Sequence, residues 1–225
     1  MKIQGNKVIY QIKGKLKGKK IYLIRHGETE YNKLGMVQGS GIDSNLNETG
    51  IKQAKAFYDY YRNVPFDKVY TSKLRRTHQS VQNFIDDELP WQQLYGLNEI
   101  SWGHKEGRQI TDEDNEQYAN MLIAWTNGDY TQKVYGGESP LEVQKRQYVA
   151  WKYILANEQE ENILVCMHGR AIRILLCLLL DIELKHMDRF VHSNLCLYLL
   201  NYEDGKFSIE KECDITHLKA SPQLV

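Results

Sequence analysis

The segment Ile21-Tyr-Leu-Ile-Arg-His-Gly27 is a short apolar run that ends in an arginine, a histidine and a glycine. A second run of this kind stands far along the chain, at Ile163-Leu-Val-Cys-Met-His-Gly169. Such runs are typical of buried strands in a parallel sheet, and a helical pattern follows each glycine. Both histidines are therefore expected at the carboxyl ends of strands, the edge at which open α/β sheets bind ligands.

The remaining periodicity predicts the same type of fold. Val69-Tyr-Thr-Ser72 indicates a third strand, followed by a helix over residues 74–85. Asp204-Gly205 stands between two strand-like segments and indicates a hairpin. Further helices are predicted over residues 47–61, 141–155 and 171–180. We predict an α/β fold, a three-layer αβα sandwich with a mostly parallel central sheet, an antiparallel edge, and a cap of helices and loops over the C-terminal strand ends.

Two regions stand apart from this pattern. Residues 1–20 hold seven lysines and no acidic residue, which predicts a basic N-terminal extension, solvated and outside the core; an edge strand through Val8, Tyr10 and Ile12 is the alternative. Residues 101–140 are rich in aromatic and acidic side chains and lack strand signals, so we expect them to form the cap. Residues 21–225 are predicted to be one domain, with this cap as an insertion within it.

The composition excludes several classes of protein. The chain of 225 residues balances 29 Lys and Arg against 29 Asp and Glu, which argues against a protein that coats nucleic acid. No apolar run approaches the roughly 20 residues that cross a bilayer. The four cysteines are widely spaced, and three stand in apolar runs, so we expect free thiols in a reducing cytoplasm. The sequence thus predicts a cytoplasmic protein without nucleic-acid or membrane partners, and leaves a homodimer open.

Four side chains are predicted to meet at one edge of the sheet. Arg25 and His26 follow the first strand, Arg76 lies one turn into the helix after the third, and His168 follows another. Two arginines and two histidines together are costly unless an anion lies among them. A phosphoryl group fits best, because guanidinium groups pair with its oxygens and an imidazole can attack phosphorus. The chain lacks P-loop, dinucleotide-loop, calcium-loop, G-x-S-x-G and H-E-x-x-H motifs, and we predict no metal and no cofactor.

With these residues in the order just described, the sequence resembles a known family, the histidine phosphatase superfamily, which includes cofactor-dependent phosphoglycerate mutases. The resemblance covers about residues 20–215 and follows the order of the family's motifs. The matching segments are residues 23–32, 38–39, 43–50, 72–80, 97–99 with Gly103 and 106–107, 137–139 and 165–169.

The resemblance implies a role for each matching residue. His26 would be the nucleophile that forms a phosphohistidine, and Glu99 would act as general acid and then as general base. Arg25, Arg76 and a protonated His168 would bind the phosphoryl oxygens. Further contacts to phosphate or substrate are expected from Asn32, Gln38, Gly39 and Gly169.

Several neighbouring residues receive other interpretations. The spacing from Ser72 favours Arg76 over Arg75 as the family's second arginine, and Asp43 is expected to make a structural turn contact. Thr77, Ser80 and Val81 depart from the family pattern at what we take to be packing positions. The other histidines are not expected to take part in catalysis. His78 is expected on a helix surface, and His104 is expected to make no contact with the substrate. The remaining three are expected at the surface or at an interface: His186, His192 and His217.

Three functions remain open. In mutases of the family that this chain resembles, the segment between the acid motif and the G-E-S motif is typically longer and rich in basic and aromatic residues. Here the segment from Glu99 to Gly137 is short and acidic, which would repel a second phosphate and admit water. The resemblance therefore favours a phosphatase that releases inorganic phosphate from a small phosphorylated metabolite. The alternative is a cofactor-dependent phosphoglycerate mutase, which moves the phosphoryl group between two oxygens of a sugar acid. A non-catalytic domain that binds a phosphorylated ligand is the third, although loss of His26 or Glu99 would be expected there.

Overall fold

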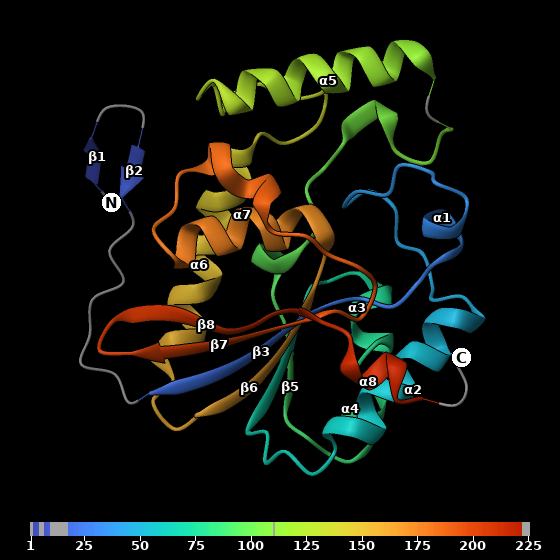
Figure 1. The fold of residues 1–225 in the computed structure, drawn as a ribbon, viewed down its shortest axis with the longest axis vertical. Coiled ribbons are helices and arrows are strands. Elements are labelled where there is room, and N and C mark those ends of the chain that lie inside the picture. Colours follow the sequence, from blue (N-terminus) through green and yellow to red (C-terminus); the bar gives the residue numbers. More distant parts are fainter. Residues whose placement is uncertain (1, 5–6, 10–17, 110, 222–225) are drawn as a thin grey trace.

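The computed structural model describes residues 2–4, 7–9, 18–109 and 111–221, and its centre is a six-stranded sheet between two layers of helices (Figure 1). The strand order is β5-β4-β6-β3-β7-β8. β3 (Lys19–Arg25), β4 (Lys68–Thr71), β5 (Trp91–Gln93) and β6 (Asn162–Met167) run parallel. β7 (Leu197–Glu203) is antiparallel to β3, and β8 (Lys206–Asp214) is antiparallel to β7. The predicted sandwich, mostly parallel sheet and antiparallel edge are confirmed.

The two helical layers bury separate apolar clusters on the two faces of the sheet. One face is covered by α6 (Pro140–Ala156), α7 (Gly169–Leu179) and the 3-10 helix η3 (Leu184–Arg189). The other is covered by α2 (Glu48–Tyr61), α4 (Gln82–Asp86) and α8 (Thr216–Lys219). Because α7 lies directly against the sheet, nearly every side chain along it is buried.

The predicted helix over residues 74–85 is wrong as a single element. The chain forms α3 (Arg75–Gln79) and α4, which are separated at Ser80 and Val81. The Ser80 hydroxyl donates to the Arg76 carbonyl at 2.6 Å and accepts the Gly27 N–H at 2.8 Å. A serine that bonds to backbone in this way competes with helix continuation, and here it joins the helix end to the chain after β3.

The hairpin at Asp204-Gly205 is confirmed. Both residues have positive φ, 49° and 80°, between β7 and β8. Two consecutive left-handed residues match the twist of the flanking strands, and glycine adopts that conformation without steric cost.

The N-terminal residues contribute strands to two separate sheets. β1 (Lys2–Gln4) and β2 (Lys7–Ile9) pair with each other in a separate two-stranded sheet, with Ile3 opposite Val8. The rest of the strand proposed through Tyr10 and Ile12 lies outside the described residues. β3 begins at Lys19, two residues inside the predicted extension. The Lys19 ammonium is buried and donates to the carbonyls of Asn157 and Glu160.

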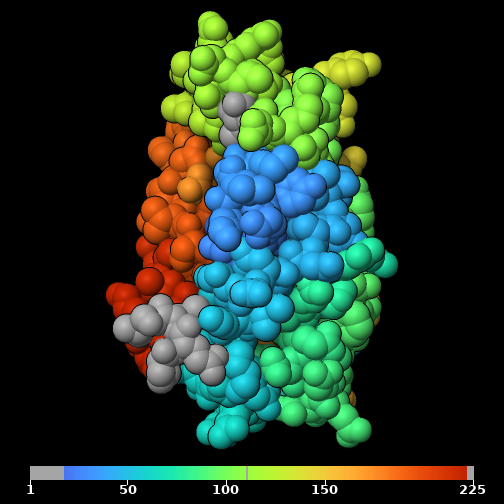
Figure 2. Space-filling model, turned by 90° about the vertical axis from the view of Figure 1, so that its right-hand side faces the viewer, coloured from blue at the N-terminus to red at the C-terminus, as the bar shows by residue number. Residues whose placement is uncertain are grey.

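Residues 101–140 contain no strand in their described parts, 101–109 and 111–140. Their main element is α5 (Asp112–Thr126), which lies at one end of the molecule (Figure 1). The 3-10 helix η2 (Gly103–Lys105) precedes α5 in this region. Two short elements lie earlier in the chain: α1 (Glu30–Lys33), which follows β3, and the 3-10 helix η1 (Tyr95–Leu97). On the face in Figure 2, residues 101–140 lie against the segment that follows β3, where the Gly107 N–H donates to the Val37 carbonyl at 2.9 Å.

Three features of the core bear on earlier expectations. The thiols of Cys166, Cys177 and Cys196 are buried and all four cysteines are free, as predicted. His217, expected at a surface or interface, is instead 1% exposed, with its ring 5.0 Å from that of Phe57.

None of the helices that the structure describes is long and apolar enough to cross a membrane.

Candidate active site

β3 and β6 bring the two histidines of the quoted runs together. The strands are parallel with Arg25 opposite Met167, so His26 and His168 leave the sheet side by side. The His26 N–H donates to the Met167 carbonyl at 3.0 Å, and the two imidazole centroids are 5.1 Å apart. Both rings are almost completely buried.

His26 has its ring proton fixed on one nitrogen. Nδ1 lies 2.7 Å from the Gly27 carbonyl oxygen. A carbonyl only accepts, so Nδ1 carries the proton and Nε2 keeps its lone pair. Burial, followed by the charges of Arg76 and Arg25, lowers the pKa of His26 well below its usual value. The ring is therefore neutral near pH 7, as a nucleophile requires.

His168 is neutral in this geometry, whereas the resemblance implies a protonated ring when phosphate is bound. Arg76 Nε donates to His168 Nδ1 at 3.2 Å. The proton must then lie on Nε2, which donates to the Ser72 hydroxyl at 2.8 Å. Burial, followed by the charges of Arg76 and His26, lowers the pKa of His168 well below its usual value. The positive charge at this side of the site comes from Arg76.

Arg76 is the buried arginine of the pair at the start of α3, as predicted. Its side chain is 0% exposed, and its terminal nitrogens donate to the Ile42 carbonyl at 2.6 Å and the Gly39 carbonyl at 3.1 Å. Burial lowers its pKa to about 10, so it stays charged at neutral pH. Arg75 is exposed and forms an ion pair with Asp43 at 3.2 Å, the structural contact expected of Asp43.

Arg25 is paired with a histidine that we expected elsewhere. Its terminal NH1 lies 3.2 Å from Nδ1 of His192, which is half-buried in the loop before β7. Burial and the charge of Arg25 lower the pKa of His192 to about 3, so its Nδ1 accepts as a neutral ring. The Arg25 Nε is buried and has no hydrogen-bond partner among residues 18–109 and 111–221, which leaves a cationic donor for an anion.

Two hydroxyl groups that we treated as packing positions hold the site together. Ser80 bridges Gly27 and Arg76, as described above. Thr77 Oγ1 lies 2.9 Å from the Ser72 hydroxyl and donates to the Leu74 carbonyl at 2.7 Å. Ser72 in turn accepts from His168. Sequence reasoning missed these contacts, although small hydroxyl residues beside a predicted catalytic arginine are a signal that could have found them.

Asn32 is linked to the backbone of His26 through Asn194. Its Oδ1 accepts the Thr29 N–H, which closes the capping box of α1, and also accepts from Asn194 Nδ2 at 3.2 Å. The same Asn194 amide donates to the His26 carbonyl at 3.0 Å. Asn194 is thus a second residue near the site that sequence reasoning did not identify.

Gln38 and Gly39 belong to the loop that supports Arg76. Gln38 Oε1 accepts from the hydroxyls of Thr29 at 2.9 Å and Ser44 at 2.8 Å, so its carbonyl has a structural role. The Gly39 carbonyl accepts from Arg76. A Cβ at position 39 would lie 2.7 Å from the Ile100 carbonyl oxygen, a backbone atom, so the loop can pack here only with glycine.

Glu99 is held at the amino-terminal end of α7, next to His168-Gly169. One carboxylate oxygen accepts the N–H groups of Ile100 at 2.9 Å and Ala171 at 2.8 Å, and the other accepts the Arg170 N–H at 3.1 Å. An acidic group at a helix N-terminus is favoured by the unpaired N–H groups there. Burial lowers the pKa of Arg25, and the negative charge of Glu99 partly offsets that effect.

The assembled residues provide a neutral imidazole with a free lone pair, two guanidinium groups and a carboxyl group near one another. Within the described part of the chain, no three His, Cys, Asp or Glu side chains gather as a metal site would require. His104 and His186 are exposed, and His78 is half-buried beside Trp91. Chemically, the cluster suits transfer of a phosphoryl group to His26.

Known proteins resemble this chain in sequence and in fold. The profile of the histidine phosphatase superfamily (branch 1) matches residues 21–215. The adenosylcobalamin/alpha-ribazole phosphatase of Salmonella typhimurium is 31% identical over 190 residues, which are 83% of this chain and 92% of that protein. The probable phosphoglycerate mutase GpmB of Yersinia pestis is 30% identical over 206 residues, covering 88% of this chain and 94% of that protein.

A solved structure agrees with these matches. The crystal structure of a putative alpha-ribazole-5'-P phosphatase from Escherichia coli superimposes with a TM-score of 0.76 at 26% identity, covering 87% of this chain and 96% of that chain. The relatives named here are phosphatases and a phosphoglycerate mutase-like enzyme. The chain is an enzyme of this kind and belongs to the histidine phosphatase superfamily, branch 1.

Proposed function

We propose that the protein is a metal-independent phosphomonoesterase that works through a phosphohistidine on His26. The substrate is a small phosphorylated metabolite of the cytoplasm, the product is inorganic phosphate, and neither nucleic acid nor membrane takes part. The observation that carries the proposal is the state of His26, whose Nδ1 proton is bound to the Gly27 carbonyl at 2.7 Å while Nε2 keeps its lone pair. Arg25 and Arg76 supply positive charge around it.

The reaction follows from these groups in two transfers. His26 Nε2 forms a bond to phosphorus as the bond from phosphorus to the ester oxygen breaks. Glu99, which enters this step in its protonated form, gives its carboxyl proton to that leaving oxygen and becomes a carboxylate. A water then attacks phosphorus, its proton returns to Glu99, and the nitrogen–phosphorus bond breaks. The charges of Arg25 and Arg76 stabilise the phosphoryl oxygens in both transition states. Each step conserves the proton on His26 Nδ1.

Hydrolysis is favoured over mutase activity by the cap. α5 begins with Asp112, Glu113 and Asp114, and the first two side chains are exposed. An acidic cap disfavours retention of a second phosphate group, which a mutase needs between half-reactions. The mutase is the second candidate, because a phosphoglycerate mutase-like protein is among the relatives at 30% identity.

The test is hydrolysis of a chromogenic aryl phosphate in the presence of EDTA, with isolation of the phosphoenzyme. We expect turnover without added metal and an acid-labile, base-stable phosphoenzyme that His26→Ala does not form. Activity that appears only with added Mg²⁺ or Zn²⁺ would contradict the metal-free mechanism. A protein that binds aryl phosphate without turning it over would instead be the non-catalytic binding domain.

A second assay separates hydrolysis from isomerisation. The enzyme is incubated with 3-phosphoglycerate, and free phosphate and bisphosphoglycerate are followed. We expect free phosphate without isomer. Rapid isomerisation with little free phosphate would assign the mutase instead. A panel of phosphorylated metabolites then identifies the leaving group.

A further inference from the structure

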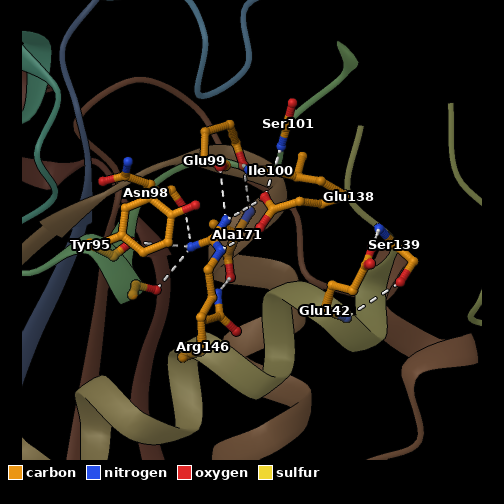
Figure 3. A network of polar contacts seen from close by, with 12 residues as sticks. Tyr95, Asn98, Glu99, Ile100, Ser101, Glu138, Ser139, Glu142, Arg146 and Ala171 are labelled. Atoms are coloured by element: carbon orange, nitrogen blue, oxygen red, sulfur yellow. Dashed lines mark hydrogen bonds and ion pairs between the residues drawn. The ribbon is translucent and has the colours of Figure 1, made fainter. Parts of the chain in front are cut away.

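Arg146 joins α6 to the segment that carries Glu99 (Figure 3). Its guanidinium forms a two-pronged ion pair with Glu138, from Nε to Oε1 at 2.8 Å and from NH2 to Oε2 at 2.9 Å. The two side chains are 11% and 19% exposed. A paired, mostly buried guanidinium of this kind fixes geometry more strictly than a surface ion pair.

The same guanidinium binds the backbone just before and at Glu99. NH1 donates to the carbonyls of Gly96 at 3.0 Å and Asn98 at 2.9 Å, and NH2 donates to the carbonyl of Glu99 at 2.8 Å. These carbonyls belong to a short 3-10 turn and the extended residues after it, which pair poorly among themselves. The guanidinium of Arg146 provides hydrogen-bond donors to all three carbonyls at once.

Glu138 completes the hold on the other side of Glu99. The oxygen that pairs with NH2 of Arg146 also accepts the Ser101 N–H at 3.0 Å. The main chain is thus fixed from residue 96 to residue 101, with Glu99 at the centre. Figure 3 shows Arg146 reaching this segment from α6, and Glu138 reaching it from the stretch just before that helix.

The segment is also packed too closely against α6 to shift freely. A Cβ added at Gly96 would lie 2.5 Å from the Arg146 carbonyl oxygen and 2.6 Å from the Ala150 Cβ. α6 therefore fixes the backbone of Glu99, whereas α7 holds its carboxylate through the N–H groups of Arg170 and Ala171. The charge of Arg146 also contributes to the lowered pKa of His168.

We propose that Arg146, paired with Glu138, is a positioning residue that sets where the Glu99 carboxyl delivers its proton to the leaving oxygen. The inference rests on the proposed function, in which Glu99 is the general acid. Arg146 touches no reacting atom in this scheme and acts through the backbone of Glu99. A displacement of about 1 Å in a catalytic group can lower a rate by about 100-fold.

The leaving group provides a readout that a purely structural role would not affect. An activated ester such as 2,4-dinitrophenyl phosphate releases a stable anion and needs no proton, whereas an alkyl phosphate such as glycerol phosphate does. A misplaced Glu99 therefore slows the alkyl ester selectively. General loss of folding or of phosphate binding slows both esters equally.

The experiment compares kcat/KM for the two esters in wild type, Arg146→Lys, Glu138→Gln and Lys145→Gln. Arg146→Lys keeps the positive charge but loses the planar fork, and Glu138→Gln removes the ion pair while keeping the side-chain size. Lys145 is exposed on the same helix, so Lys145→Gln is the matched control for loss of charge. Thermal unfolding of each variant reports its folding.

We expect Arg146→Lys to lose about 10- to 100-fold on glycerol phosphate and less than about 3-fold on the dinitrophenyl ester. Glu138→Gln should also lose more activity on glycerol phosphate than on the dinitrophenyl ester, with a smaller loss than Arg146→Lys. Lys145→Gln should match wild type on both esters. Equal losses on both esters, or no loss on either, would overturn the inference. If Arg146→Lys does not fold, the selectivity of Glu138→Gln decides. Failure of the proposed function is distinguishable, because wild type would then hydrolyse neither ester.

Discussion

Arg76 Nε and His168 Nδ1 lie 3.2 Å apart and share a hydrogen bond, so the guanidinium and the imidazole do not carry two adjacent positive charges. The cation is the arginine, and the histidine is a neutral ring held by Arg76 on one side and Ser72 on the other. The charge on this side of the site is therefore insensitive to pH across the range in which histidine normally titrates.

Acid should destabilise the folded protein through its buried histidines. Burial lowers the pKa of His217 to about 4, and its Nε2 donates to the Leu195 carbonyl at 2.8 Å. The unfolded state therefore binds more protons below pH 6.5, and stability falls as pH drops towards 4. We expect His217 alone to contribute a loss of about 2 kcal/mol between pH 7.5 and pH 5.

Urea unfolding at the two pH values measures this effect. His217→Phe should unfold with a smaller pH dependence than wild type. His186→Phe is the control, because His186 is exposed and its substitution should leave the pH dependence unchanged. A His217→Phe variant with the same pH dependence as wild type would refute the assignment.

Ser80→Ala should damage both folding and activity. It removes the acceptor of the buried Gly27 N–H and the donor to the Arg76 carbonyl. An unsatisfied buried N–H costs about 1–3 kcal/mol, to be measured by urea unfolding. Activity on aryl phosphate should fall at least about 10-fold, because both His26 and Arg76 lose a support.

Ser208→Ala, at an exposed position of β8, is the matched control for Ser80→Ala. It should leave stability and activity at the wild-type level. A Ser80→Ala enzyme with wild-type stability would show that the hydroxyl bridge has no energetic role.

His192→Phe should weaken phosphate binding. Phenylalanine fills the same space but offers no acceptor to NH1 of Arg25, which lies 3.2 Å from His192 Nδ1. Loss of one hydrogen bond of about 0.5–1.5 kcal/mol corresponds to about a 2- to 10-fold weaker competitive inhibition by inorganic phosphate. His192→Asn, which retains an acceptor, should bind phosphate more tightly than His192→Phe, and the reverse order would contradict this role.

Gly39→Ala should displace the loop that supports Arg76. The new Cβ would lie 2.2 Å from the Glu106 carboxylate and 2.7 Å from the Ile100 carbonyl. Overpacking of this kind costs about 1–3 kcal/mol, seen as a lower midpoint of thermal unfolding, with a parallel loss of kcat/KM. Gly18→Ala is the control, because its Cβ would meet only the Tyr202 carbonyl at 3.6 Å, an ordinary contact.

The parts of the site that lie on regular elements could be predicted from the sequence. Apolar runs place His26 and His168 at the ends of β3 and β6, because buried parallel strands leave a clear hydrophobic signal. The spacing from Ser72 likewise distinguishes Arg76 from Arg75. These positions depend on local pattern and on the general geometry of α/β sheets.

The rest depends on contacts between distant segments. The break between α3 and α4 arises from the Ser80 bridge to Gly27, which no helical periodicity records. The charge of His168 depends on which atom of Arg76 faces it, and the pairing of His192 with Arg25 depends on the path of a loop. From the sequence, Arg146 is indistinguishable from an ordinary polar residue of an amphipathic helix. Only the structure shows that its guanidinium binds the backbone at Glu99.

The hydrogen bond between His26 Nδ1 and the Gly27 carbonyl has a consequence for the second half of the proposed reaction. With the proton held on Nδ1, a ring phosphorylated at Nε2 is an imidazolium and withdraws electrons from its bond to phosphorus. When water attacks, the ring departs as a neutral molecule and needs no proton from elsewhere. One backbone carbonyl thus makes the same nitrogen a good nucleophile in the first step and a good leaving group in the second.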